Sequence, residues 1–260
     1  MDAEDLVAEW EELFSKPVTG WDFAELAGVA QDDTSWSYVD VVREVLSGAR
    51  SVLDIGTGGG EFLKSLVDAL PADTVATEGW PPNVSVAAAA LTPQGIPVLS
   101  YRAGREREMP FDAERFDVVL ARHEEYNAAE VARVLRPGGV LVTQQVEAEN
   151  LSDLRALLAF ASPYPHQTLS AHVRAAVDAG FGIDAAENWE GATTFPEVAS
   201  LVRYLAMVPW EAPHDFSPAR YADVLLALAD QHRSLIFTVR RFLLIARRPG
   251  AAAATGSAST

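Results

Sequence analysis

Residues 52–63, VLDIGTGGGEFL, constrain the fold more than any other stretch of the chain. A short aliphatic run containing Asp54 leads into Gly56, Gly58 and Gly60, after which an amphipathic pattern begins. This order predicts a buried strand, a tight turn and the start of a helix. Glycine suits such a turn because it can adopt positive φ and because its missing Cβ lets a ligand approach the backbone. The stretch therefore predicts a nucleotide-binding loop.

Acidic side chains beside this loop indicate which kind of nucleotide it binds. Asp54 and Glu61 lie on either side of the glycines. A dinucleotide-binding loop carries a glycine where this chain has Glu61, and it places a pyrophosphate at the helix N-terminus. Two carboxylates would repel those phosphates. S-adenosylmethionine fits better, because it has no phosphate and carries a sulfonium and an ammonium group. The alternative is a turn that binds nothing.

A second stretch, RVLRPGGVLV at residues 133–142, points in the same direction as the glycine-rich loop. The loop resembles motif I of the class I S-adenosylmethionine-dependent methyltransferases of small-molecule type, and the similarity covers about residues 35–146. The resemblance implies an α/β fold with a doubly wound, Rossmann-like sheet of seven strands. The last strand is expected to be antiparallel, with helices on both faces of the sheet.

Glu78 follows a predicted strand about twenty residues beyond the loop, where a carboxylate can accept hydrogen bonds from both ribose hydroxyls. The resemblance assigns it the same role. Trp80 follows closely and either lies against adenine or fills a gap between helices. The family pattern places an aspartate after the third strand to accept from the adenine amino group, but this chain has Arg105 there. An arginine cannot accept a hydrogen bond, so Glu106, Glu108 or a backbone carbonyl has to replace the aspartate.

The predicted cofactor-binding set joins the loop, the ribose acid and the residues after the next strands. Its members are Asp54, Gly56, Thr57, Gly58, Gly60, Glu78, Gly79, Trp80, Arg105, Glu106, Arg122 and His123.

His123 is the predicted general base. It follows the predicted strand 115–121 at the edge of the sheet where doubly wound folds bind ligands. A histidine near its ordinary pKa can remove the proton from a phenol, an alcohol or a protonated amine. Glu124 stands next to it and can orient it or stabilise its charge, so both are predicted catalytic residues. The alternative is a histidine that only bonds a loop backbone.

Aromatic and amide side chains are predicted to bind the acceptor, although each aromatic can equally serve to cover the sheet. These residues are Trp36, Tyr38, Tyr126, Gln145, Tyr204 and Trp210.

Four segments are expected along the chain: an N-terminal helical cap (1–34), the methyltransferase domain (35–248), a helical insertion within it (188–234) and a disordered tail (249–260). The insertion separates a sixth strand, which ends at residue 187, from the last strand. It is expected to form either a lid over the acceptor pocket or an oligomer contact.

Charge and composition narrow the function. The 260 residues include 20 basic and 37 acidic side chains, and the net charge of −17 opposes nucleic acid and anionic membranes as partners. No cysteine supplies a thiolate, and the histidines show no metal-ligand spacing. An acidic start and no long apolar run predict a cytoplasmic protein, and the arginine and alanine bias predicts a bacterial one.

The sequence therefore predicts a methyltransferase that uses S-adenosylmethionine and transfers the methyl group to an oxygen or nitrogen atom of a small-molecule acceptor. It is expected to be a monomer or a homodimer without a metal. The alternatives are an RNA methyltransferase, and a protein of the same fold that binds S-adenosylmethionine without catalysis.

Overall fold

A computed structural model describes residues 2–18, 26 and 28–250. The chain divides into two compact units. The first unit comprises Met1–Ser37, Val146–Thr168 and Asn188–Phe242. The second unit comprises Tyr38–Gln145, Leu169–Glu187 and Leu243–Thr260. Most of the predicted tail, residues 251–260, lies outside the described residues, as does part of the predicted cap.

Five neighbouring strands form the parallel part of the sheet, in the order β4-β3-β2-β5-β6. Their bounds are Ser51–Ile55 (β2), Asp73–Glu78 (β3), Val98–Ser100 (β4), Phe116–Arg122 (β5) and Leu135–Val146 (β6). Strand β2 is buried along its whole length, as expected for a central strand with both faces covered. The carboxyl ends of these parallel strands carry the predicted cofactor-binding residues.

Two long strands complete the sheet beyond β6, in the order β6-β8-β7. Strand β7 is Gly182–Phe195 and strand β8 is Leu235–Arg247, and each contributes residues to both units. Gly138 donates to the Arg248 oxygen at 2.9 Å and Glu147 to the Arg240 oxygen at 3.1 Å, so β8 runs antiparallel to β6. The predicted doubly wound sheet with an antiparallel last strand is confirmed.

The sheet differs from the prediction at its edge. An eighth strand, β1 (Ala30–Gln31), pairs with the far end of β7 in antiparallel register. Strand β7 therefore continues to Phe195, whereas the predicted sixth strand ends at residue 187. The pairing of Thr193 and Thr194 with β1 explains the extra length, and it places residues 188–195 in a strand rather than in a helical insertion.

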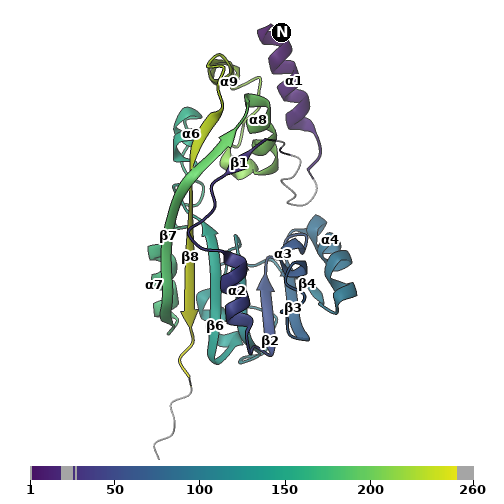
Figure 1. Ribbon diagram of the computed structural model, residues 1–260, viewed down its shortest axis with the longest axis vertical. Helices are drawn as coiled ribbons and strands as arrows, with labels where there is room; N and C mark the ends of the chain where they lie inside the picture. The colour runs from purple at the N-terminus through teal and green to yellow at the C-terminus, as the bar shows by residue number, and fades with distance from the viewer. Residues whose placement is uncertain (1, 19–25, 27, 251–260) are drawn as a thin grey trace, which may run out of the picture. The chain divides into compact units, whose positions relative to one another are not determined.

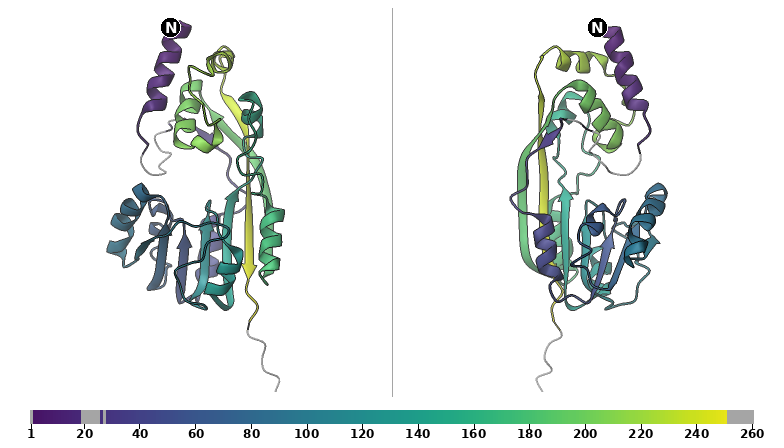
Figure 2. Two further views of the ribbon diagram at one scale, coloured as in Figure 1. Left: turned by 180° about the vertical axis from the view of Figure 1, so that it is seen from behind. Right: turned by 45° about the vertical axis from the view of Figure 1, so that its right-hand side comes forward.

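Helices surround the strands of the second unit. They are α2 (Tyr38–Leu46), α3 (Glu61–Lys64), α4 (Pro81–Leu91), η2 (Thr92–Gln94), α5 (Ala128–Val134) and α7 (Leu169–Asp178). Figure 1 shows α2 in front of the strands, and the reversed view in Figure 2 shows α7 on their other side. The core of this unit includes Leu53, Phe116, Val119, Leu141 and Leu244.

The first unit has a core of its own. Its helices are α1 (Ala3–Ser15), α6 (Ser152–Leu157), α8 (Val198–Met207), η3 (Pro209–Glu211) and α9 (Ala222–Ala229). Asp2 caps α1 through a reciprocal capping box with Asp5, and α1 packs beside α8 (Figure 1). The core includes Trp10, Phe195, Leu201 and Phe237. No helix among the described residues has both the length and the apolar character needed to cross a membrane.

Candidate functional site

The glycine-rich loop adopts the predicted turn between β2 and α3. Gly56, Gly58 and Gly60 have φ values of +69°, +64° and +89°, which other residues rarely adopt. Thr57 donates its backbone N–H to the oxygen of Thr77 at 2.9 Å, which joins the loop to the end of β3. Gly60 is the N-cap of α3, the predicted helix after the loop, which is only four residues long. The loop is thus a backbone turn fixed between two parallel strands.

Glu78 connects the loop to the next βα turn. Its Oε2 accepts the backbone N–H of Gly58 and its Oε1 accepts that of Trp80, both at 2.7 Å. The side chain is buried. Each carboxylate oxygen can accept more than one hydrogen bond, so this arrangement leaves acceptor capacity for ligand hydroxyls. The predicted ribose acid and the predicted loop therefore lie in direct contact.

Two further carboxylates lie against the loop. A Cβ atom at Gly56 would collide with Cγ of Glu124 and would lie 2.7 Å from its Oε2. A Cβ atom at Gly59 would likewise collide with the carboxylate of Glu61. Together with buried Asp54 and Glu78, they surround the turn with carboxyl groups. Such a site disfavours phosphate and favours a cationic ligand.

Burial changes the acidity of two of these groups. It raises the pKa of Asp54 to about 7, and the charge of Glu78 adds to the effect while Arg122 opposes it. Burial also raises the pKa of Glu124 to about 7, again with a contribution from Glu78. A cation bound near either group favours its charged form and lowers its pKa.

Asn83 adds a polar group that the sequence did not reveal. Its side chain is 1% exposed, and its amide nitrogen and oxygen have no hydrogen-bond partner among the described residues. Asn83, Ala87 and Leu91 are the buried residues of α4, spaced four apart on one face. Leu91 lies against Gly60 of the loop. The face of α4 that carries the unpaired amide is therefore the face that packs toward the loop.

Asparagine is a favoured N-cap residue, but Asn83 does not cap α4. Trp80 is the N-cap, and Pro81 and Pro82 occupy the first helical positions, where proline is favoured. Asn83 consequently lies inside the first turn. The sequence gives a capping signal for asparagine but no signal for an unpaired buried amide.

These residues fit S-adenosylmethionine. The cofactor would lie against the backbone of the loop at Gly58, and Glu78 would accept from its ribose diol. The unpaired amide of Asn83 would offer both a hydrogen-bond donor and an acceptor to a base edge. The carboxylates match its positive charges.

His123 lies at the carboxyl end of β5 with a left-handed φ of +60°. Its backbone N–H donates to the oxygen of Gln144 at 2.8 Å, and its ring Nε2 lies 3.1 Å from Nε2 of Gln144. The ring is thus tied to β6, while the side chain of Glu124 lies over Gly56. Arg122 extends its guanidinium over the rings of Tyr38 and Phe62, at 5.6 and 5.2 Å from their centres.

Three predicted acceptor-binding residues use their polar groups within the second unit. The hydroxyl of Tyr38 donates to the Val142 oxygen at 3.3 Å. The hydroxyl of Tyr126 lies 3.0 Å from Nδ1 of His172. The amide of Gln145 donates to the backbone oxygen of Glu124 at 2.8 Å. Gln145 thus positions Glu124, and contact of these three with an acceptor stays a prediction.

The other predicted residues are more dispersed. Trp36, Tyr204 and Trp210 belong to the first unit, where the Tyr204 ring packs at 5.2 Å from Phe195. Trp210 is 38% exposed. Arg105 and Glu106 are exposed in the loop between β4 and β5. Gly79 allows the backbone at residue 79 to pack closely against that of Arg102, because a Cβ atom at Gly79 would lie 2.7 Å from Cα of Arg102.

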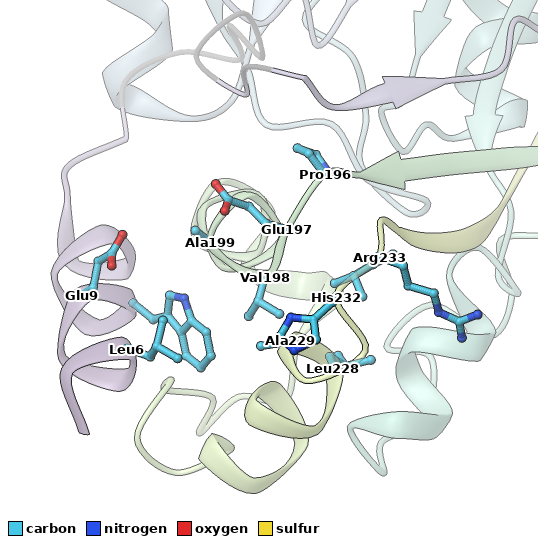
Figure 3. A pocket seen from close by; sticks show the side chains of 12 residues that line it. Leu6, Glu9, Pro196, Glu197, Val198, Ala199, Leu228, Ala229, His232 and Arg233 are labelled. Carbon is cyan, nitrogen blue, oxygen red and sulfur yellow. The ribbon is translucent and has the colours of Figure 1, made fainter. Parts of the chain in front are cut away.

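A pocket of about 290 Å³ lies within the first unit (Figure 3). Leu6, Val198 and Leu228 form its apolar lining, and His232 and Arg233 lie on its side nearest β8. It contains none of the predicted site residues. In the described part of the chain, no group of three or more His, Asp or Glu side chains is placed to hold a metal ion.

Comparison with known proteins agrees with this geometry. Residues 53–143 match the family described as a methyltransferase domain. These residues include most of β2, the glycine-rich loop, Glu78 and β5, which carry the site described above. Residues 53–143 therefore match a methyltransferase domain, and the sheet has the Rossmann-like fold of such proteins.

Individual relatives show how far the likeness extends. The chain is 39% identical over 97 residues to a ubiquinone biosynthesis O-methyltransferase of Azorhizobium caulinodans, covering 37% of each chain. It is 27% identical over 155 residues to a demethylmenaquinone methyltransferase of Roseiflexus castenholzii, covering 55% of this chain and 62% of that one. The structure of a putative methyltransferase from Bacillus halodurans aligns with this chain with a TM-score of 0.57 at 21% identity, over 82% of this chain and all of that one.

Proposed function

We propose that the chain transfers a methyl group from S-adenosylmethionine to an oxygen or nitrogen atom of a small-molecule acceptor. The observation that carries the proposal is Glu78, whose carboxylate accepts the backbone N–H groups of both Gly58 and Trp80. This one side chain joins the glycine-rich loop to the βα turn in which a ribose-binding acid is expected. The surrounding carboxylates favour a cationic cofactor over a dinucleotide.

The cofactor would supply an electrophilic methyl carbon on a sulfonium. Catalysis of such a displacement is largely a matter of orientation, so the chain's main contribution is to hold the two reactants. In the neutral ring of His123, Nε2 would accept from the amide nitrogen of Gln144 and Nδ1 would carry the proton. His123 can therefore accept the acceptor's proton at Nε2 once the acceptor replaces Gln144 there. Its place at the ligand edge of the sheet supports this role.

The names of two relatives support a small-molecule acceptor. One refers to O-methylation in ubiquinone biosynthesis and the other to demethylmenaquinone. The net charge of −17 adds support, because it opposes the approach of a nucleic acid. A cytoplasmic location and a monomeric or homodimeric state stay predictions.

Calorimetric titration with S-adenosylmethionine, S-adenosylhomocysteine and NAD tests the cofactor assignment. We expect the first two to bind and NAD not to bind. Incubation with methyl-labelled cofactor and a panel of phenols, alcohols and amines then tests transfer. Binding without transfer to any panel member would favour the non-catalytic alternative, and binding of NAD alone would refute the proposal.

The role of His123 can be tested separately once an acceptor is found. If the acceptor carries a proton that must be removed, His123→Ala should lower kcat by roughly 10²–10⁴-fold. The affinity for S-adenosylhomocysteine should change little. His214→Ala, at an exposed histidine of the first unit, serves as the matched control. Full activity of the His123 variant between about pH 6 and 9, which brackets an ordinary histidine pKa, would show that orientation alone is sufficient.

A further inference from the structure

Glu124 follows the buried strand β5, and its side chain turns back over the glycine-rich loop. Its Cγ and Oε2 occupy the space that a side chain at position 56 would fill. Gln145, which is 1% exposed, holds the backbone there by donating to the oxygen of Glu124 at 2.8 Å. The missing Cβ of Gly56 is therefore required by the side chain of Glu124.

The electrostatic surroundings of Glu124 are predominantly acidic. The charge of Glu78 disfavours its ionised form, and so does the charge of Glu125, whereas a hydrogen bond from the backbone of Glu125 and the charge of Arg102 favour it. Asp54 lies buried at the base of the same loop. With burial as the largest contribution, these charges raise the pKa of Glu124 to about 7. A partly buried carboxyl with acidic neighbours gains most from a cationic partner that arrives with the ligand.

We propose that the carboxylate of Glu124 pairs with the positive charge of the methionyl end of the bound cofactor. This inference rests on the proposed function and assigns Glu124 to cofactor binding rather than to the orientation of His123. Two independent features of the structure support it: the contact of Glu124 with Gly56, and its fixation by Gln145.

The pairing has a proton balance that can be measured. Near neutral pH part of Glu124 carries a proton, and the carboxylic acid has to release it to the solvent before the carboxylate can pair with an ammonium group. Binding should therefore release protons, and affinity should rise as the pH rises through 7. Replacement of Glu124 by glutamine removes both the charge and the released proton while keeping the shape of the side chain.

The test uses the full chain and two probes that share adenine and ribose. S-adenosylhomocysteine carries the ammonium group, whereas 5′-methylthioadenosine does not. Glu124→Gln should weaken binding of S-adenosylhomocysteine about tenfold or more, with little change for 5′-methylthioadenosine. Glu125→Gln, which removes the same charge one residue later, is the matched control. Calorimetry in two buffers of different ionisation enthalpy should show less proton release for Glu124→Gln than for wild type.

The outcomes distinguish failure of the Glu124 pairing from failure of the proposed function. If wild type binds S-adenosylhomocysteine and Glu124→Gln binds it equally well, the pairing is refuted while the proposed function stands. Equal loss for both probes would also refute it, because Glu124 would then act on the shape of the loop. If wild type binds neither probe, the proposed function itself fails. A thermal unfolding midpoint at or above that of wild type confirms that the variant is folded.

Discussion

At the scale of single residues, Asp54 gives the clearest prediction. It is 3% exposed, and burial raises its pKa to about 7. At pH values between the ordinary pKa of a carboxyl group and 7, Asp54 keeps its proton in the folded chain but has lost it in the unfolded chain. The contribution of Asp54 should therefore lower the free energy of unfolding of the ligand-free protein as the pH rises from about 4 to about 7. Above that range this contribution should stay constant.

Asp54→Asn should remove this dependence, since an amide does not titrate. Urea unfolding at pH 5 and at pH 8, without cofactor, measures it. At pH 8 the variant should have a higher free energy of unfolding than wild type. Because one unit of pKa shift corresponds to about 1.4 kcal/mol, the difference should be on the order of a few kcal/mol. The gain should be smaller at pH 5. An equal gain at both values would show that the carboxyl does not titrate in this range.

Single residues also show what the sequence could predict. Gly56, Gly58 and Gly60 were found because positive φ leaves a strong signal in the choice of residue. The spacing from the loop to Glu78 follows from the length of one βα unit. The contact of Glu124 with Gly56 was not predicted, because it depends on the turn after β5, in which His123 adopts a left-handed φ of +60° without being glycine.

At the scale of elements, the presence and order of the strands were predicted more accurately than the residues at which the strands end. The last strand was predicted to follow the insertion that ends at residue 234, and β8 begins at Leu235. By contrast, β7 runs eight residues past its predicted end because it pairs with β1. That pairing joins positions more than 160 residues apart and leaves no local pattern. Any deletion that tests the predicted lid should therefore start after Phe195, which belongs to the core of the first unit.

The starts of α4 and α5 each have an asparagine, and the two residues are predicted to have opposite effects on stability. Asn127 caps α5 by accepting from the backbone N–H groups of Ala129 and Glu130, whereas Asn83 lies unpaired within α4. Asn127→Leu should lower stability by about 0.5–2 kcal/mol through loss of the cap. Asn83→Leu should raise the stability of the ligand-free protein, by about 1 kcal/mol, because it removes two buried unpaired polar groups.

Denaturant midpoints of the two variants, measured side by side without cofactor, make the comparison. If Asn83→Leu loses as much stability as Asn127→Leu, the amide of Asn83 is hydrogen-bonded in solution, for instance to a buried water. In that case the structure would no longer support a hydrogen bond between the Asn83 amide and the adenine base of the cofactor.

At the scale of the whole molecule, the two units have separate cores with no residue in common. The first unit also contains a buried ion pair, in which Arg155 of α6 lies 3.3 Å from Glu211 of η3. Asn150 donates to the other oxygen of Glu211 at 2.8 Å. The predicted cofactor-binding residues all belong to the second unit. Stability of the first unit and affinity for the cofactor should therefore respond to different substitutions.

Arg155→Met tests this separation, because it leaves the carboxylate of Glu211 buried without its arginine, a loss of about 3–5 kcal/mol for such pairs. Hydrogen exchange should accelerate in α8 and α9, while β2 and β3 keep their protection and S-adenosylhomocysteine binds with wild-type affinity. Arg43→Met, which removes an exposed pair with Asp68, should change little. If β2 and β3 lose protection together with α8, the strands β7 and β8 couple the cores into one cooperative unit, and separate responses are excluded.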